Sequence, residues 1–382
     1  MNFGFAFGKD LLMEKIMNKN FGFIGIGLIG GSIAKTLRKV YPDCTITVYN
    51  RGADAREMAL ADGTANVATG EVDKTFSDCD YIFLCTPVEH NTTYLSILKD
   101  IIKDDCIITD VGSVKGNIHK AVSELDMEEN FIGGHPMAGS EKTGYENSHN
   151  HMLENAFYAI TPTEKVSSDK VDEYKQIVTD MGAIPIIFSP EEHDHTVATI
   201  SHLPHLIASS LVNLVKDNDS KEEYMKTLAA GGFKGITRIA SSSADMWEQI
   251  CMTNGEEISK MLEKYIESLK TVKDELDTKD ASAIHEMFVE SKNYRDNIDN
   301  LSNSIILNHF TLFCDIVDES GAIATIATIL ATNGVNIRNI GIVHNREFEE
   351  GVLRITFHKQ DDADKAYEQL VKHKYSVIKR YE

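Results

Sequence analysis

The stretch Phe21-Gly-Phe-Ile-Gly-Ile-Gly-Leu-Ile-Gly-Gly-Ser32 decides the fold. It starts as a short apolar strand, passes through a glycine-rich turn and opens a helical pattern that continues to Val40. The turn has the spacing GxGxxG, with Gly25, Gly27 and Gly30 as its glycines. Between a strand and a helix, this spacing is the dinucleotide-binding fingerprint. The first glycine permits the tight turn, the second lets the backbone approach the pyrophosphate, and the third lets the helix pack on the strand.

The helix after the turn begins at Leu28 and Ile29, and its unpaired N–H groups are expected to face the cofactor phosphates. The strand Thr45–Tyr49 should carry the residue that reads the adenine ribose, and it ends in Asn50 and Arg51 where an acidic residue is usual. Asn50 can hydrogen-bond the ribose, and Arg51 can pair with a 2′-phosphate. The expected cofactor is therefore NAD, with NADP also open.

Two further strands should reach the same edge of the sheet. One ends in Thr86 and Pro87, which are expected to contact the cofactor. The other is an apolar run that enters the segment Gly133–Glu141, where glycines and Pro136 are expected to stop the strand and leave His135 at its carboxyl end. Ligands bind at this edge of an open α/β sheet, and histidine suits proton transfer near neutral pH. His135 is therefore the candidate catalytic base.

The composition indicates a globular protein with an acidic surface. The chain has 382 residues, of which 42% are hydrophobic and 25% charged, and its formal net charge is −21. That charge argues against nucleic acid and anionic membranes as partners. No apolar run reaches membrane-spanning length, and the cysteines show no CxxC spacing, which indicates reduced thiols in a cytoplasmic protein. Residues 1–16 make a poor signal peptide and are expected to be an N-terminal extension.

Changes in the hydrophobic pattern divide the chain into three predicted domains. Strands alternate with helices over residues 17–189, which predicts an α/β, Rossmann-like dinucleotide-binding domain whose sheet is closed by Tyr158–Pro162 and Ile184–Phe188. Residues 190–302 show only helical patterns, with heptad-like apolar spacing that suits a substrate and dimerisation domain. Residues 306–382 alternate as β-α-β-β-α-β, the ferredoxin-like split unit.

Several separated motifs carry a resemblance to a known family. Beside the glycine turn they are Ser113 after a strand, Gly133–Glu141, Ser201-His-Leu-Pro-His205, and Gly231-Gly-Phe-Lys-Gly-Ile-Thr-Arg-Ile-Ala240. Together they closely resemble the prephenate dehydrogenases over about residues 17–300. The family often has an aspartate where this chain has Gly235, so the ion pair that the aspartate makes is absent here.

The resemblance implies oxidative decarboxylation of prephenate to 4-hydroxyphenylpyruvate in tyrosine biosynthesis. Hydride leaves C4 for NAD(P)+ as the C4 hydroxyl loses its proton and carbon dioxide leaves C1. This chemistry needs a proton acceptor, a cation for the carboxylates and a dry, fixed geometry. Arogenate, which carries an amine in place of the side-chain keto group, remains an alternative substrate. The resemblance also implies a homodimer.

The family pattern assigns roles to residues of this sequence. His135 would hold the substrate hydroxyl and take its proton, and Ser113 would hydrogen-bond both His135 and that hydroxyl, fixing the useful imidazole tautomer. Arg238 would clamp a substrate carboxylate through its planar fork. Ser201 and His205 lie four residues apart on a predicted helix and would meet the substrate from the helical domain.

Further expectations concern the substrate cleft. Glu141 is expected as a gate or substrate contact, and Trp247 as a wall of the cleft, while His193 and His202 are expected to be structural. The histidines of residues 193–205 have no carboxylate arrangement that completes a metal site. Hydride transfer to a nicotinamide requires no metal, so none is expected.

The tail resembles an ACT domain, a common small-molecule sensor. Its strand-to-helix turn at Gly321 and Ala322, together with the strand opening at Asn336 and Ile337, would bind L-tyrosine as a feedback inhibitor. A β-hydroxyacid dehydrogenase is a second interpretation, but the catalytic lysine of that class cannot be placed here. An amino-acid sensor without turnover is a third, and the presence of His135 and the other expected catalytic residues argues against it.

Overall fold

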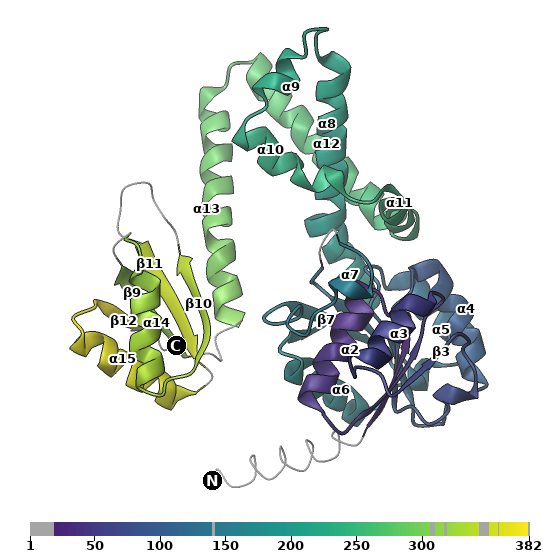
Figure 1. Cartoon of the computed structure of the whole chain (residues 1–382). Coiled ribbons are helices and arrows are strands. Elements are labelled where there is room, and N and C mark those ends of the chain that lie inside the picture. Colours follow the sequence, from purple (N-terminus) through teal and green to yellow (C-terminus); the bar gives the residue numbers. More distant parts are fainter. Residues whose placement is uncertain are drawn as a thin grey trace. The chain divides into compact units, whose positions relative to one another are not determined.

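The structure is a computed structural model of the chain (Figure 1). It describes residues 19–139, 142–305, 310–316, 319–343, 351–357 and 359–380. The predicted N-terminal extension, residues 1–16, lies outside them. Two compact units make up the chain, Met1–Asp274 and Glu275–Glu382.

The first unit begins with a parallel five-stranded sheet. Its strands are β1 (Asn20–Ile24), β2 (Thr45–Tyr49), β3 (Val67–Thr69), β4 (Tyr81–Leu84) and β5 (Ile107–Asp110). They lie in the order β3-β2-β1-β4-β5, so the strand order reverses between β1 and β4. In a doubly wound sheet the ligand crevice lies at this reversal, beyond the carboxyl ends of the strands. The predicted Rossmann-like α/β class is confirmed.

Helices cover both faces of this sheet. They are α2 (Leu28–Val40), α3 (Ala53–Ala61), α4 (Val88–Lys99), α5 (Gly116–Glu124) and α6 (Ser168–Asp180), with short 3₁₀ turns η1 (Lys74–Phe76), η2 (Glu128–Asn130) and η3 (Tyr145–Asn147). Apolar residues of α2, α3 and α6 join one core cluster, and those of α4 and α5 join the other. Phe23 and Phe83 stack at 5.0 Å in the first core. Burying each ring stabilises the fold by about 2 kcal/mol.

The predicted closing strands form a second sheet. Its strands are β6 (Ile132–Pro136), β7 (Phe157–Pro162) and β8 (Ile184–Ile187), with β6 antiparallel to β7 and an isolated bridge to the first sheet. The prediction that the glycines stop the strand is wrong, because Gly133 and Gly134 lie inside β6; the strand ends at Pro136 and leaves His135 at its carboxyl end, as predicted. The glycines allow close packing instead: a Cβ at Gly134 would lie 2.7 Å from the carbonyl oxygen of Asp110.

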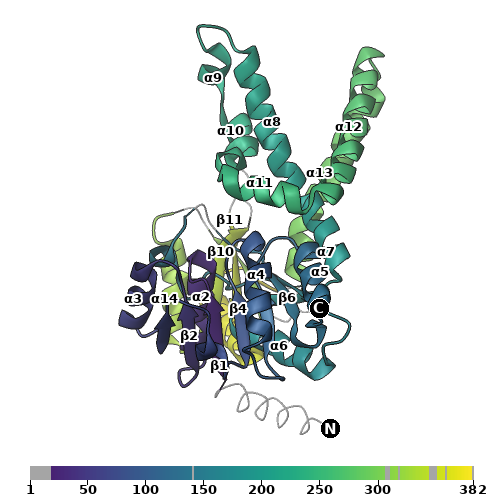
Figure 2. The ribbon, with the colours of Figure 1, turned by 90° about the vertical axis from the view of Figure 1, so that its right-hand side faces the viewer.

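A long helical segment leaves the sheet domain after β8. It comprises α7 (Pro190–Val197), the π-helical turn η4 (Ala198–His202) and α8 (Leu203–Asn218). A capping box fixes its start, because the Ser189 hydroxyl accepts from the N–H of Glu192 while the Glu192 carboxylate accepts from the N–H of Ser189. Figure 2 shows α8 rising from the sheet domain with its neighbouring helices. These are α9 (Tyr224–Leu228), α10 (Gly231–Thr237), the 3₁₀ turn η5 (Arg238–Ser241), α11 (Ala244–Thr253) and α12 (Gly255–Asp277).

The helical segment Pro190–Asn218 is long and apolar enough to cross a membrane by length and composition, and 28% of its most apolar window is buried. Its first turns, however, hydrogen-bond the sheet domain through Asp194. We therefore interpret the segment as the helix that joins the two halves of the first unit. Leu214, Leu228 and Met252 of the helical half are 60%, 78% and 75% exposed, which leaves apolar surface for a partner.

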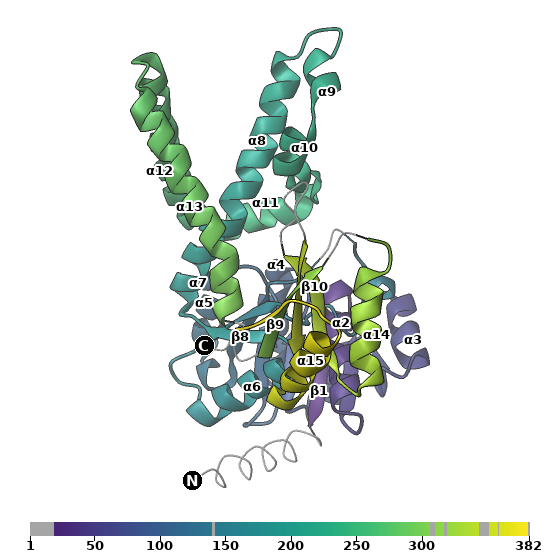
Figure 3. The same ribbon diagram turned by 90° about the vertical axis from the view of Figure 1, so that its left-hand side faces the viewer.

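The second unit contains the end of α12, the helix α13 (Ala281–Ile305) and a small α+β fold. Its elements are β9 (Phe310–Ile316), α14 (Ala322–Thr332), β10 (Ile337–Val343), β11 (Gly351–Phe357), α15 (Gln360–Lys372) and β12 (Val377–Arg380). The antiparallel sheet has the order β10-β11-β9-β12, and α14 and α15 pack on one face of it (Figure 3). The predicted ferredoxin-like β-α-β-β-α-β order is confirmed.

Candidate active site

The glycine turn between β1 and α2 has the geometry of a dinucleotide site. Gly25 has a φ of +95°, and a Cβ there would lie 2.9 Å from the Thr86 methyl carbon. A Cβ at Gly30 would lie 2.9 Å from the Cβ of Cys85, so helix and strand leave no room for a side chain. Around Gly27 the space is open, which leaves its backbone accessible to a pyrophosphate. No side chain caps α2, so its first N–H groups are available to an anion.

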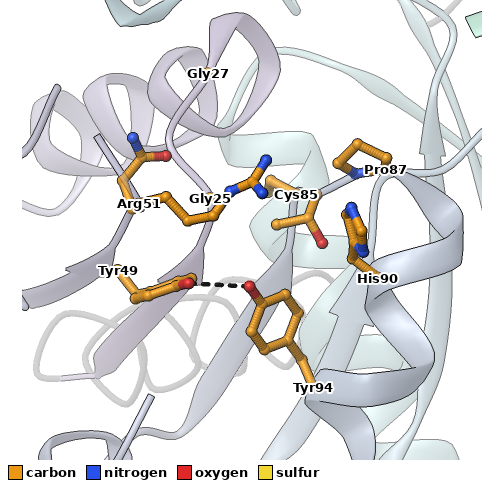
Figure 4. Close-up of a pocket in the computed structure, with 10 residues that line it drawn as sticks. Gly25, Gly27, Tyr49, Arg51, Cys85, Pro87, His90 and Tyr94 are labelled. Carbon is orange, nitrogen blue, oxygen red and sulfur yellow. Dashed lines mark hydrogen bonds between the residues drawn. The ribbon is translucent and has the colours of Figure 1, made fainter. Parts of the chain in front are cut away.

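A cavity of about 190 Å³ opens beside the glycine turn (Figure 4). Arg51, Pro87 and His90 line it, together with Tyr49 and Tyr94, whose hydroxyl oxygens lie 3.0 Å apart. None of the described side chains that line the cavity is acidic. A cavity without a carboxylate does not repel a phosphate group at the ribose.

Asn50 and Arg51 follow β2 at this cavity and differ in what they contact. The Oδ1 of Asn50 accepts from the N–H of Ile26 at 3.3 Å, and its Nδ2 donates to the carbonyl oxygen of Gly52 at 3.3 Å. Asn50 therefore braces the glycine turn. The side chain of Arg51 is exposed and pairs with no carboxylate among the described residues, so it is available to a ligand phosphate.

The end of β4 supplies a further polar group. The hydroxyl of Thr86 donates to the Oδ1 of Asn91 at 2.5 Å, while the buried Nδ2 of Asn91 lacks a partner in the described structure. An unpaired buried donor costs about 1–3 kcal/mol. A ligand oxygen at this edge would satisfy it, so this observation, with the open space at Gly27, fits a bound dinucleotide.

His135 lies on β6 beside a fully buried ion pair. The Nζ of Lys115 donates to the Oδ2 of Asp110 and, at 2.7 Å, to the carbonyl oxygen of Gly134. The Oδ1 of Asp110 accepts from the N–H of Gly134 at 3.2 Å. Burial lowers the pKa of Lys115, and the charge of Asp110 opposes that shift. The ion pair thus binds both the N–H and the carbonyl oxygen of Gly134, the residue before His135, and so fixes the position of β6.

The imidazole of His135 also contacts a second histidine. Its Nδ1 lies 2.9 Å from the Nε2 of His193 on α7, and the rings meet at 68°. The Nδ1 of His193 lies 2.8 Å from the Oδ1 of Asp194. That carboxylate accepts from the backbone N–H groups of Lys115 at 2.8 Å and Gly116 at 2.7 Å. The start of α5 is thus capped by a residue of α7.

The environment of His135 favours its neutral form. Burial lowers the pKa of His135 well below its usual range, and His193, Lys115 and His202 lower it further. A neutral imidazole at physiological pH has a lone pair available for a proton. The site can therefore act as a general base.

Ser113 does not meet its expected partner in this structure. It lies in the loop between β5 and α5, and no hydrogen bond joins its side chain to His135 or to any other described residue. The Nδ1 of His135 meets the Nε2 of His193 instead. The serine hydroxyl is left available to a ligand.

The helical half contributes a separate group of candidates. The ring of His205 stacks on that of Trp247 at 3.7 Å, and the buried Nε1 of Trp247 has no partner in the described part of the chain. Burial lowers the pKa of His205, and the charge of Arg238 lowers it further. Arg238 is exposed and forms no ion pair with a described residue. Ser201 lies in the π-helical turn η4, a geometry often found at functional sites.

No direct hydrogen bond or ring contact joins His135 to Arg238 among the described residues. The ring centroid of His202 is 5.9 Å from that of Trp247, and His202 is also among the groups that lower the pKa of His135. The Nδ2 of Asn254 lies 3.2 Å from the Nδ1 of His202 and 2.9 Å from the backbone oxygen of Asp194, which ties α11 to the segment.

Two expected sites are only partly visible. Glu141 lies outside the described residues. In the second unit, Gly321, with a φ of +92°, and Ala322 begin α14, and Ile337 begins β10 directly after Asn336.

Sequence reasoning missed the residues that support His135. The sequence-based expectations give no role to Asp110 or Lys115 and only a structural one to His193. Two signals could have indicated them. Asp110 and Lys115 flank the loop that holds Ser113, and the pair His193-Asp194 follows a capping box that fixes where its helix begins.

Comparisons with known proteins agree on one family. Residues 33–187 match the family model of the prephenate dehydrogenase nucleotide-binding domain, and residues 189–290 match that of the prephenate dehydrogenase dimerization domain. The prephenate dehydrogenase of Bacillus subtilis is 34% identical over 90% of this chain and 93% of its own length.

Solved structures give the same result. The crystal structure of prephenate dehydrogenase from A. aeolicus, in complex with hydroxyphenyl propionate and NAD+, has a TM-score of 0.69 and 32% identity, covering 73% of this chain and 98% of that one. Arogenate dehydrogenase of Synechocystis has a TM-score of 0.67 and 26% identity, covering 73% of this chain and 99% of that one.

Proposed function

This chain belongs to the prephenate dehydrogenase family, and on that premise we propose how its own residues carry the family reaction. It is an NAD-dependent oxidoreductase that converts prephenate to 4-hydroxyphenylpyruvate and carbon dioxide. The observation that carries the residue assignment is the neutral imidazole of His135, placed on the strand that follows the cofactor-binding sheet.

In the proposed mechanism, the Nε2 of His135 accepts the proton of the C4 hydroxyl as hydride leaves C4. Carbon dioxide then leaves C1, its bonding electrons complete the aromatic ring, and the proton returns from His135 to the phenolic oxygen. Bound NAD+ supplies the hydride acceptor. Because the pKa of His135 is lowered, the residue is neutral at physiological pH and accepts the proton without first losing one.

Substrate binding is proposed to fall to the helical half. Arg238 is an exposed cation whose planar fork suits a carboxylate, and it lies near the stacked pair of His205 and Trp247. Ser201 and the Nε1–H of Trp247, which has no partner in the described part of the chain, are proposed as further donors to the substrate. Ser113 is proposed to contact the substrate hydroxyl directly, since its own hydroxyl is not engaged elsewhere.

The dinucleotide is proposed to lie along the glycine turn. Gly25, Gly27 and Gly30 shape the turn, Leu28 and Ile29 offer the first N–H groups of α2, and Thr86 and Pro87 form the opposite wall. Arg51 faces the ribose end of the cavity, where the described lining has no carboxylate to exclude a 2′-phosphate. We therefore propose that NADP is accepted as a second, weaker cofactor.

One assay tests substrate and cofactor choice together. The protein is mixed with prephenate or arogenate and with NAD+ or NADP+, and the absorbance of the reduced cofactor is followed. Prephenate with NAD+ should give the highest kcat/KM. A higher kcat/KM with arogenate would overturn the substrate assignment, and no reduction with any pair would overturn the activity.

Feedback control is proposed for the C-terminal unit. In its β-α-β-β-α-β fold Gly321 precedes α14 and Asn336 precedes β10, and we propose that L-tyrosine binds at these two turns. Titrating tyrosine into full-length enzyme and into enzyme lacking residues 306–382 tests this. Inhibition should disappear with the tail, and unchanged inhibition would remove the tail from the mechanism.

The proposed division of labour follows the sequence. Residues 17–189 bind the cofactor, residues 190–302 bind substrate and form the homodimer, and residues 306–382 regulate. The exposed apolar side chains of the helical half fit the dimerization domain that its sequence matches. We place the enzyme in the cytoplasm, because its thiols are unpaired among the described residues and its substrate is a biosynthetic intermediate.

A further inference from the structure

Two buried residues, His193 and Asp194, form a line of hydrogen bonds that ends on the imidazole of His135; we call these three residues the relay. The distances are 2.9 Å from the Nδ1 of His135 to the Nε2 of His193, and 2.8 Å from the Nδ1 of His193 to the Oδ1 of Asp194. We propose that His193 and Asp194 are positioning residues that hold His135 in the one neutral tautomer whose Nε2 can accept the substrate proton. This inference rests on the proposed function, in which His135 is the general base, and assigns the residues that orient it.

The carboxylate of Asp194 decides which atom donates in each hydrogen bond of the relay. The carboxylate of Asp194 already accepts backbone N–H bonds on both oxygens, from Lys115 on Oδ1 and from Gly116 on Oδ2. An ionised carboxylate has no proton to give, so the Nδ1 of His193 must be the donor in the bond between them. In the neutral imidazole of His193, the Nε2 then carries the lone pair.

The second link is therefore fixed as well. Because the Nε2 of His193 is an acceptor, the Nδ1 of His135 must donate to it. The remaining nitrogen of His135, Nε2, is left unprotonated. In the opposite tautomer, two lone pairs would face each other 2.9 Å apart. The relay therefore selects the tautomer that a general base needs.

The relay is rigid because each member is buried and held from another element. His193 is 1% exposed and Asp194 is 7% exposed. A Cβ added at Gly116 would lie 3.0 Å from the Oδ2 of Asp194, so the start of α5 closes directly on the carboxylate. The backbone oxygen of Asp194 accepts from the Nδ2 of Asn254 at 2.9 Å. Three elements, β6, α5 and α7, thus meet at the base.

The same carboxylate stabilises the base after it takes the proton. A positive charge on the ring of His135 would lie within two hydrogen bonds of the Asp194 carboxylate. The proton itself stays on the Nε2 of His135 until it returns to the product. Asp194 holds and polarises the chain and does not become protonated.

The first test compares two substitutions of His193. His193→Phe keeps an aromatic ring and removes the acceptor, so the tautomer is no longer selected and kcat should fall by about 10²-fold or more, with the KM for prephenate within about threefold of wild type. His193→Gln returns an acceptor oxygen near the position of Nε2 and should recover at least about tenfold of that loss. Equal kcat values for wild type and the Phe variant would overturn the proposal.

His195→Gln provides the matched control on the same helix. His195 is half exposed, and its Nδ1 lies 2.9 Å from a carboxylate oxygen of Glu257, away from His135. Its kcat should stay within about twofold of wild type. If His195→Gln lost as much kcat as His193→Phe, the effect would belong to α7 as a whole, and the relay would be rejected.

A spectroscopic test needs neither substrate nor a substituted relay. In enzyme labelled with ¹⁵N-histidine, His135 is assigned as the signal set that His135→Asn removes. The relay predicts that Nδ1 of His135 carries the hydrogen and that Nε2 shows the chemical shift of an unprotonated imidazole nitrogen. The reverse pattern would overturn the proposal even if turnover is normal. Failure of the proposed function, seen as normal turnover in His135→Asn, would leave this tautomer result unchanged, so the two failures are distinguishable.

Discussion

The two halves of the proposed site, around His135 and around Arg238, differ in how many of their polar side chains are paired within the protein. Around His135, the polar side chains of the supporting residues are hydrogen-bonded. The Nζ of Lys115 donates to Asp110 and Gly134, and the carboxylate of Asp194 accepts three hydrogen bonds. Around Arg238, the cation is exposed and has no described ion-pair partner, and the Nε1 of Trp247 is unpaired. One half is closed and the other is open.

This difference separates chemistry from binding. A base must hold one protonation state and one orientation in every turnover, which favours a buried, fully hydrogen-bonded surround. A substrate clamp must leave its charge unpaired until an anion arrives, since an internal ion pair would compete with the ligand. We therefore expect substitutions in the closed half to change kcat and substitutions in the open half to change KM.

The largest effect is expected at His135 itself. His135→Asn removes the proton acceptor while keeping a polar side chain, so kcat should fall by about 10²- to 10⁴-fold. The KM for prephenate should change little, because the carboxylate clamp is intact. Steady-state kinetics with NAD+ measures both constants. A variant that kept kcat and lost affinity would reverse the assignment of the two halves.

Arg238→Ala should produce the opposite pattern. Losing a charge-assisted bond to a carboxylate costs about 1.5–3 kcal/mol, so the KM should rise about 10- to 100-fold with kcat nearly unchanged. Arg238→Lys should fall between wild type and alanine, because lysine keeps the charge and loses the planar fork. Lys216→Ala, which removes an exposed cation of α8 outside the motifs named above, serves as the control and should leave KM within about twofold.

Two glycines of the dinucleotide turn show the same contrast, because Gly30 is packed against protein atoms and Gly27 faces open space. Gly30→Ala places a Cβ against Cys85, so we expect a loss of about 1–3 kcal/mol in the free energy of unfolding. Gly27→Ala meets no protein atom and should leave stability within about 0.5 kcal/mol while raising the KM for NAD+. Thermal unfolding without cofactor and NAD+ titration separate the two effects. Equal destabilisation by both variants would contradict the assignment of Gly30 to packing and of Gly27 to cofactor binding.

The smallest effect concerns His202, a buried residue beside Trp247. Burial lowers its pKa to about 4, against about 6.5 in the unfolded chain. Between these values the unfolded state binds the proton and the folded state does not, so stability falls as pH falls through this window. The slope from this residue is at most about 1.4 kcal/mol per pH unit. Denaturant unfolding of wild type and His202→Gln between pH 7 and pH 5 should show a shallower slope for the variant; identical slopes would remove His202 as the source.

The sequence predicted the fold well because its signals are local. The spacing of Gly25, Gly27 and Gly30 specifies a turn, and the alternation in residues 306–382 specifies a strand and helix order, without reference to distant residues. The exception was β6, where glycines suggested a strand end. They serve close packing against the Asp110 carbonyl oxygen and Tyr158, a contact that only the assembled sheet defines.

The site was harder to predict because its supports come from distant parts of the chain. His135 stood out by its place at a strand end, but His193 lies 58 residues further on and reaches it only after α7 folds back on the sheet. The family pattern suggested Ser113 as the partner of His135, and the tertiary structure places His193 there. No local pattern distinguishes a buried structural histidine from one that orients a base.

The central claim, that His135 takes the substrate proton during hydride transfer, is tested most directly by a single-turnover experiment. Wild type and His135→Asn are saturated with NAD+ and mixed rapidly with prephenate at a concentration below that of the enzyme. The single turnover is followed by cofactor absorbance, which isolates the chemical step from product release. The account predicts a hydride-transfer rate at least about 100-fold lower in the variant. Equal rates in the two proteins would contradict it.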